Sequence, residues 1–472
     1  MRHLFLLPLC LALSAQEIPT TLKDQQSLAV TIYNSNLALV KDQREVRLPK
    51  GPLQLAFQEV SAQIRPETAI LRNLTSPKDF WIAEQNFDFD LLTPQKLLEK
   101  YVGEKVEVIK TAPQGQAETR EQATVLATNS GVVLQFADRI ETSAPGRIVY
   151  PKVPGNLRAR PTLVMNLNSG AASAQKLELS YLTGGLTWRA DYVASLSADE
   201  KVLDLSGWVT LTNQSGASYP NATLQLVAGD VNVAPTPRPM VEMAFDAGGR
   251  QMAKAAPTMS EESLFEYHLY TLDRPTTLKE NQTKQVAMLS ASNIPVAKEY
   301  RLQGQSHYYS GSYGDLGQKL KIAVFVSFQN KESASLGKPL PKGIVRVYKN
   351  DSAGKAQFIG EDSIDHTPKN EDIKLKLGDA FDVTASRKQT DFKKVGSSGK
   401  FNTIYESAYE VVIKNAKKEA VTVTVLEPMP GDWEILEKSH AFTKEASGTA
   451  KFLVNVPADG SATLKYRARV KW

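Results

Sequence analysis

Apolar and polar residues alternate one by one along most of the chain. Short segments with this pattern include "LAVTIYN" from Leu28, "KLELSYL" from Lys176, "KIAVFVSFQN" from Lys321 and "AYEVVIKN" from Ala408, and Gly, Pro, Asn or Asp residues separate them. Alternation places the apolar side chains on one face of an extended strand, where they can pack into a core. The pattern therefore predicts an all-β protein built from β-sandwich modules.

One segment departs from this pattern and predicts a helix. In "LLTPQKLLEKYVGE", Thr93 is suited to cap the helix, Pro94 to its first turn and Gly103 to its end. The closely spaced strand patterns that follow, "GEKVEVIK" and "EQATVLATNSGVVLQFADR", are separated by a turn signal at Asn129 and Gly131. We predict a short helix with a small barrel-like β-module, inserted in the N-terminal half of the protein.

A second break marks the middle of the chain. Residues 234–263 are rich in Pro, Ala, Gly and Met without any sustained period, which predicts a flexible linker; a long surface loop of a sandwich is the alternative. The predicted organisation is a signal peptide over 1–15, a β-rich segment over 16–90, the helix and barrel-like module over 91–158, a continuation of the N-terminal sandwich over 159–233, the linker over 234–263, and a C-terminal β-sandwich region over 264–472.

The N-terminus has the features of an export signal. A short basic start precedes an apolar run from Leu4 to Leu13, and small residues follow at Ser14 and Ala15. The run is about half the length that a membrane-spanning helix needs, and no later stretch approaches that length. Cys10, the only cysteine, lies in this segment. We predict a periplasmic or secreted protein with no transmembrane helix, cleaved after Ala15, with cleavage after Ser14 as the alternative.

Composition narrows the class of function. The chain has 42% hydrophobic and 23% charged residues and a formal net charge of +5, with the basic residues interspersed among acidic ones. This distribution argues against a nucleic-acid partner. The nucleophile elbow, the zinc-binding helix motif and the phosphate-binding loop are all missing, and the histidines are far apart in sequence. We assign no catalytic residues, and a protein without enzymatic activity is the favoured class.

Two aromatic stretches are candidate binding sites. Trp188 lies in "GLTWRADY", where it could form a platform for a sugar or a peptide; a core position between sheets is the favoured alternative. The stretch "QSHYYSGSYGD" contains His307, Tyr308 and Tyr309 and has the composition of an adaptable polar loop, although a hairpin tip is the favoured interpretation.

An acidic stretch, "GEDSIDHTPKNED" from Gly360, is the candidate ion site. Its oxygen-rich side chains suit Ca²⁺, but their spacing does not follow the twelve-residue calcium loop. The favoured interpretation is a polar connection between two strands that turns at Thr367 and Pro368, with ion binding second and catalysis third. The candidate ligands of the ion are Glu361, Asp362, Asp365 and His366.

Several long segments of the chain resemble a bacterial family of unknown function, the DUF4139 domain proteins. They are "LTGGLTWRADYVASL" from Leu182, "LDLSGWVTLTNQSGASYPNATLQLVAGDVN" from Leu203, the segment around the acidic stretch from Val345, and "LEPMPGDWEI" from Leu426. The resemblance implies an extracytoplasmic all-β protein. It implies no activity, because no catalytic residues of the family are known.

Three hypotheses about function remain. The leading one is a non-catalytic exported β-sandwich protein that acts as a binding or scaffolding component of the bacterial cell envelope, with a protein or an envelope polymer as partner. The second is a hydrolase, metal-dependent or otherwise, whose site is assembled around residues 361–372. The third is a structural protein associated with the outer membrane, suggested by the alternating C-terminal strand "ATLKYRARVKW", which ends in Trp472.

Overall fold

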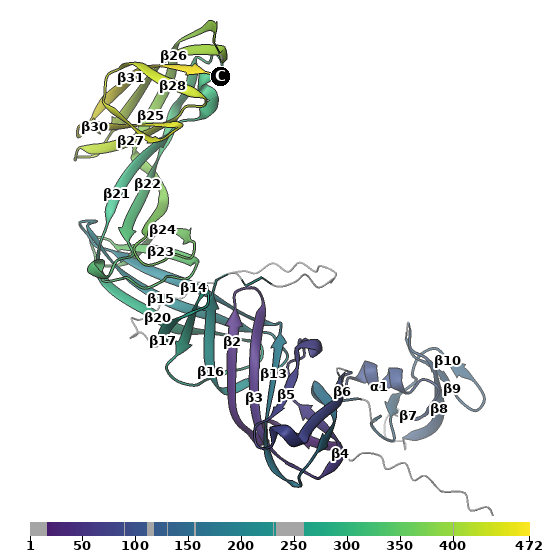
Figure 1. Ribbon diagram of the computed structural model, residues 1–472. Coiled ribbons are helices and arrows are strands. Elements are labelled where there is room, and N and C mark those ends of the chain that lie inside the picture. Colours follow the sequence, from purple (N-terminus) through teal and green to yellow (C-terminus); the bar gives the residue numbers. More distant parts are fainter. Residues whose placement is uncertain are drawn as a thin grey trace, which may run out of the picture. The chain divides into compact units, whose positions relative to one another are not determined.

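Strands form almost all of the regular structure in the computed structural model (Figure 1), which describes residues 17–88, 90–110, 118–129, 131–154, 157–229, 231–232, 259–399 and 401–472. Within these residues α1 (Pro94–Lys100) is the only α-helix. The all-β prediction is therefore confirmed. The predicted signal peptide with Cys10, and residues 234–258 of the predicted linker, lie outside the described residues.

The chain divides into two units. Unit 1 comprises the described residues of Met1–Trp188, Leu211–Asn232 and Ser260–Lys284; unit 2 comprises those of Arg189–Thr210, Val233–Met259 and Gln285–Trp472. The last residues of the predicted linker, 259–263, belong to a strand. No helix among the described residues is long and apolar enough to cross a membrane.

Two sheets of unit 1 form a sandwich. On the facing sides, the Arg44 guanidinium lies 3.8 Å from the centre of the Phe57 ring, and the Gln175 amide donates to the Ser169 hydroxyl at 3.0 Å. The smaller sheet has the order β1 (Glu17–Thr20), β4 (Gly51–Gln58), β12 (Thr162–Ser169) and β6 (Phe80–Asp88). The larger has the order β17 (Met259–Leu264), β18 (Tyr267–Leu272), β16 (Tyr219–Ala228), β2 (Gln25–Tyr33), β3 (Leu37–Leu48), β13 (Ser173–Thr183) and β5 (Ile70–Asn73), with β19 (Thr276–Leu278) paired to β16.

The helix and the small β-module form a separate part of unit 1. The Thr93 hydroxyl accepts a hydrogen bond from the Lys96 backbone N–H at 3.1 Å, which agrees with the predicted cap of α1. Tyr101, Val108 and Leu134 pack into a core of this module's own. Its sheet has the order β10 (Ile140–Glu141), β9 (Val133–Gln135), β8 (Thr119–Ala127), β7 (Lys105–Lys110) and β11 (Arg147–Val149).

Two further sheets belong mainly to unit 2. The larger one contains the longest strand, β25, whose second half pairs with β26 over most of its length (Figure 1). The first sheet has the order β20 (Gln282–Pro295), β15 (Val202–Asn213), β14 (Leu186–Leu196), β23 (Gly343–Asn350) and β24 (Ala356–Ile364). The second has the order β28 (Asp432–Lys438), β31 (Gly460–Lys471), β26 (Phe401–Asn415), β25 (Asp372–Ser398), β22 (Asp315–Gln329), β21 (Ala297–Gln303), β27 (Val421–Pro428), β30 (Thr449–Val456) and β29 (Phe442–Ala446).

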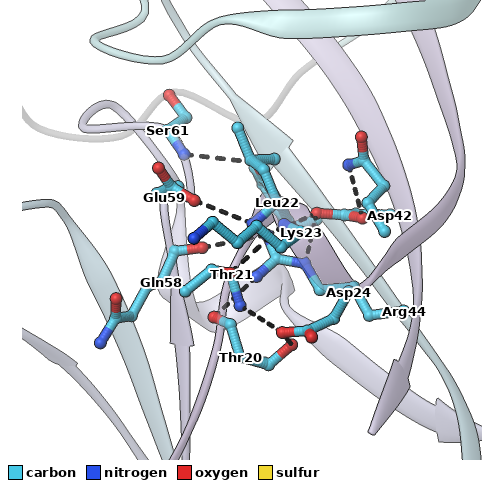
Figure 2. A network of polar contacts seen from close by, with 12 residues as sticks. Thr20, Thr21, Leu22, Lys23, Asp24, Asp42, Arg44, Gln58, Glu59 and Ser61 are labelled. Carbon is cyan, nitrogen blue, oxygen red and sulfur yellow. Dashed lines mark hydrogen bonds and ion pairs between the residues drawn. The ribbon is translucent and has the colours of Figure 1, made fainter.

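A buried arginine holds the first strand of unit 1 in place (Figure 2). The Arg44 side chain donates from Nη2 to the Asp42 carboxylate at 2.8 Å, from Nη1 to the Thr20 carbonyl at 2.8 Å and from Nη2 to the Gln58 carbonyl at 2.9 Å. The 3₁₀ helix η1 (Leu22–Asp24) follows β1 and begins with a capping box between Thr21 and Asp24. Arg44 thus connects β1, β3 and the end of β4, and its own charge is neutralised.

A second buried ion pair lies in the core of unit 2. The Arg387 guanidinium donates to the Glu427 carboxylate at 2.5 Å, and both side chains are fully buried. The Tyr309 hydroxyl donates to the other Glu427 oxygen at 3.0 Å and lies 2.9 Å from the Tyr466 hydroxyl. Burial raises the pKa of the Glu427 carboxyl, and the Arg387 charge opposes that rise. This pair is surrounded by tyrosine rings and apolar side chains.

Candidate functional site

A row of polar side chains crosses the solvent-facing side of the smaller sheet in unit 1. Gln54, Asn166 and Glu84 are direct neighbours on β4, β12 and β6. The Gln54 amide donates to the Asn166 side-chain oxygen at 3.0 Å, and the Asn166 amide donates to the Glu84 carboxylate at 3.0 Å. The Asn86 amide donates to the other Glu84 oxygen at 3.0 Å. These bonds fix the orientation of the row before any ligand binds.

A β-bulge brings Trp81 onto the same face. Asn166 pairs with Glu84, but Leu167 pairs with Ile82, so Ala83 is an extra residue in β6. Because successive side chains of a strand point to opposite faces, residues three apart normally lie on opposite sides of a sheet. The extra residue cancels this offset, and Trp81, which pairs with Asn168, shares the face with Glu84.

The face is hollowed beside Trp81. A depression of about 450 Å³ lies between this tryptophan and the neighbouring strands. The Trp81 side chain is 59% exposed although it is large and apolar, and the half-buried Asn168 amide has no hydrogen-bond partner among the residues that the structure describes. The depression is lined by Pro52, Leu53, Gln54, Trp81, Ala83, Asn166, Leu167 and Asn168.

The electrostatics of the face are those of a hydrogen-bonding surface. The hydrogen bonds from Asn86 and Asn166 lower the pKa of the Glu84 carboxyl, so Glu84 is a carboxylate at neutral pH and accepts hydrogen bonds only. The amides of Gln54, Asn166 and Asn168 can both donate and accept. The face therefore combines one exposed aromatic plane with several fixed polar groups. We call Gln54, Trp81, Glu84, Asn166 and Asn168 the aromatic–amide face.

The structure places the predicted Trp188 site inside the protein. Trp188 is only 5% exposed, and its indole nitrogen has no hydrogen-bond partner among the described residues. This burial agrees with the favoured interpretation of Trp188 as a core residue.

The second aromatic stretch forms a 3₁₀ helix, η4 (Ser306–Tyr309), between β21 and β22. Tyr308 and Tyr309 are buried, and the Gln389 amide and the Tyr409 hydroxyl both donate to the Tyr308 carbonyl. His307 is exposed, with its ring 4.7 Å from that of Tyr308. Binding of a ligand by these residues stays a prediction, in which His307 is the accessible member.

The acidic stretch connects two strands, as the favoured interpretation predicted. Its first residues, 360–364, form the end of β24, and residues 365–371 connect β24 to the start of β25 at Asp372. Within this connection Thr367 exchanges two backbone hydrogen bonds with Leu340. The Asn330 amide donates to the Pro368 carbonyl at 2.9 Å. The connection is thus fixed by polar contacts to the preceding chain.

The four candidate ion ligands face different partners. Glu361 forms an ion pair with Arg346 at 3.1 Å, and the Asp362 carboxylate accepts two backbone hydrogen bonds. The Asp365 carbonyl accepts from the Thr367 hydroxyl, and His366 Nδ1 accepts from the Lys342 backbone N–H. Among the described residues no three His, Cys, Asp or Glu side chains are grouped as metal ligands. The calcium site stays a prediction.

The aromatic–amide face did not emerge from the sequence. Its residues come from three strands that are up to 114 positions apart, from Gln54 to Asn168, so their proximity depends on the pairing of β4, β12 and β6. The bulge at Ala83 also leaves no local signal. In "DFWIAEQN" Trp81 stands between the apolar residues Phe80 and Ile82, so the segment does not indicate an exposed aromatic side chain.

The chain matches a known protein family. The model of the family described as "Domain of unknown function (DUF4139)" matches residues 177–472, more than half of the chain. The aromatic–amide face lies before the matched residues. Comparison with curated proteins gives no match.

Proposed function

We propose a function for this chain, which belongs to the DUF4139 family, from the chemistry of its own residues, because the family description names no activity. The protein acts as an exported, non-catalytic binding component of the bacterial cell envelope. Its ligand is an envelope polysaccharide, held on the aromatic–amide face. The observation that carries this proposal is the exposed Trp81 ring beside the Asn168 amide, which has no hydrogen-bond partner among the described residues.

A sugar polymer fits both halves of this surface. The C–H side of a pyranose ring is apolar and can lie against the indole plane, so that Trp81 buries area that is otherwise exposed to water. The ring hydroxyls can then exchange hydrogen bonds with Asn168 and Asn166, and they can donate to Glu84. Because Glu84 and Asn166 already hold each other, little side-chain entropy is lost when the ligand binds.

The lining of the depression supports binding rather than cleavage. Hydrolysis of a glycosidic bond commonly uses two carboxyl groups that flank the bond, about 5–10 Å apart. The depression is lined by amides, apolar groups and the indole, and Glu84 is the one carboxylate on the aromatic–amide face. A polymer could therefore be held there without a pair of carboxyl groups flanking a glycosidic bond.

The proposal predicts that Trp81→Ala weakens binding by about thirtyfold, since an aromatic hot-spot residue contributes ~2 kcal/mol or more to a binding free energy. The measurement is co-sedimentation of the full chain with insoluble peptidoglycan and other envelope polysaccharides. Asn168→Ala should weaken binding less, by about fivefold, because one hydrogen bond is worth ~1 kcal/mol.

The matched control is Phe381→Ala, which removes an aromatic ring that is 94% exposed in unit 2 and lies outside the aromatic–amide face. This variant should bind as the wild type does. Equal retention of the wild type and Trp81→Ala would contradict the proposal, and so would failure of every polysaccharide to retain the wild type.

A further inference from the structure

The hairpin between β25 and β26 ends in a basic segment. Between Phe392 and Tyr405 the sequence contains no acidic residue, and Lys393 and Lys394 are both exposed. Lys393 lies 3.5 Å from Asp391, whereas Lys394 forms no ion pair with any residue that the structure describes. We call the described residues of 392–405, together with Trp472, the hairpin tip.

Aromatic side chains lie next to these lysines. The rings of Phe392 and Tyr405 are 5.2 Å apart, and Tyr405 pairs with Lys394 across the two strands. Trp472 lies beside β26, because its backbone N–H donates to the Thr403 carbonyl at 2.9 Å. Trp472 is 44% exposed and Val395 is 54% exposed. The tip thus presents apolar and aromatic groups together with positive charge.

The rest of the same strands is electrically balanced. Arg467 bonds to Asp391 at 2.8 Å, and Arg469 bonds to both Glu406 and Glu434. Ion pairs of this kind neutralise the outer surface of β26 and β31. The positive charge of the tip is therefore a local feature and does not continue along the sheet.

We propose that the hairpin tip binds the surface of an anionic membrane. Lys393 and Lys394 lie close to the lipid phosphates, and Val395 and Trp472 enter the boundary between headgroups and acyl chains. Tryptophan is favoured at that depth because its ring is apolar and its N–H is polar. Lysines have long apolar stems that let their charges stay in the headgroup layer. Basic residues next to a membrane surface strengthen binding when the lipids are anionic.

The shape of the tip favours a membrane over an acidic protein. A protein partner contributes most of its binding energy through side chains seated in well-packed pockets. The tip is the end of a hairpin, and its lysines and Val395 are exposed on it. A lipid surface adapts to such an end without a matching pocket.

The test is co-sedimentation of the full chain with vesicles of phosphatidylglycerol and phosphatidylcholine, and with vesicles of phosphatidylcholine alone. We expect binding to the anionic vesicles only, weakened by salt. Lys393→Gln combined with Lys394→Gln should weaken it roughly thirtyfold. The matched control, Lys417→Gln combined with Lys418→Gln, removes two lysines outside the tip and should leave binding unchanged.

The apolar part of the tip has its own control. Val395→Asp and Trp472→Ala should each weaken vesicle binding about tenfold, whereas Leu453→Asp, which changes a residue that is 57% exposed on β30, should not. Equal binding of the control and tip variants would overturn the proposal. So would binding of a soluble polyanion, such as polyglutamate, as tight as that of the anionic vesicles. The assay contains no polysaccharide, so its outcome is independent of the function proposed for unit 1.

Discussion

Replacing Arg387 with methionine is expected to lower the free energy of unfolding of unit 2 by about 3–5 kcal/mol, since removal of one partner leaves the other as an uncompensated buried charge. That partner is the Glu427 carboxylate, which has no exposed surface. Urea denaturation followed by tryptophan fluorescence measures the change.

The double replacement Arg387→Met with Glu427→Leu separates the ion pair from general packing. Nε and Nη1 of Arg387 have no hydrogen-bond partner among the described residues, so the guanidinium is desolvated without full compensation. We therefore expect the double variant to recover most of the stability that the single variant loses. The control is Lys321→Met, which removes an exposed lysine 3.5 Å from Asp379 and should change stability by less than about 1 kcal/mol. A single variant as stable as this control would contradict the prediction.

In unit 1 the corresponding change is Arg44→Met, with an expected loss of about 3–5 kcal/mol. The replacement leaves the Asp42 carboxylate buried without its charge partner, and it removes the donors to the Thr20 and Gln58 carbonyls. Because β1 depends on one of these bonds, we also expect faster proteolytic cleavage near Thr20. Urea denaturation and limited proteolysis measure the two effects.

Arg120→Met is the matched control in unit 1. Its guanidinium pairs with Glu107 at 3.5 Å, but the Arg120 side chain is 61% exposed. An exposed pair of this kind contributes little, so the control should lose less than about 1 kcal/mol. If Arg44→Met lowers the free energy of unfolding as little as Arg120→Met does, the proposed role of Arg44 is wrong.

The sequence around each buried arginine indicates its burial. In β3 every second residue lies on the same buried face, and this set includes Val40, Asp42, Arg44 and Val46. In β25 the buried positions Val383 and Ala385 are followed, in the same phase, by Arg387. A charged residue in phase with a buried apolar stripe predicts a paired charge in the core. Its partner could be identified from sequence only for Arg44, where Asp42 is two residues away.

Local patterns predicted the elements well because they depend on neighbouring residues. Alternation in "KLELSYL" gives β13, and the cap at Thr93 gives the start of α1. The pairing partners of the strands could not be predicted from these local patterns. For example, β14 pairs in parallel with β23, about 150 residues later. The burial of Tyr309 could not be predicted for the same reason, because Glu427, which accepts the hydrogen bond of its hydroxyl, is 118 residues away.

The candidate site failed to appear from sequence for a different reason. Strict alternation places Trp81 and Glu84 on opposite faces, and only the extra residue Ala83 brings them together. A bulge depends on the pairing with β12, so the segment around Trp81 alone does not reveal it.

The claim that Trp81 contacts a polysaccharide is tested most directly by NMR of the tryptophan side chains. The full chain has five tryptophans, so selective ¹⁵N labelling gives few indole signals, and Trp81→Ala identifies the signal of Trp81. The ligand is a soluble oligosaccharide fragment of the polysaccharide that retains the wild type. We predict a saturable shift of the Trp81 signal, while that of the buried Trp188 stays in place. A shift confined to another tryptophan, or no shift at all, would contradict binding on the aromatic–amide face.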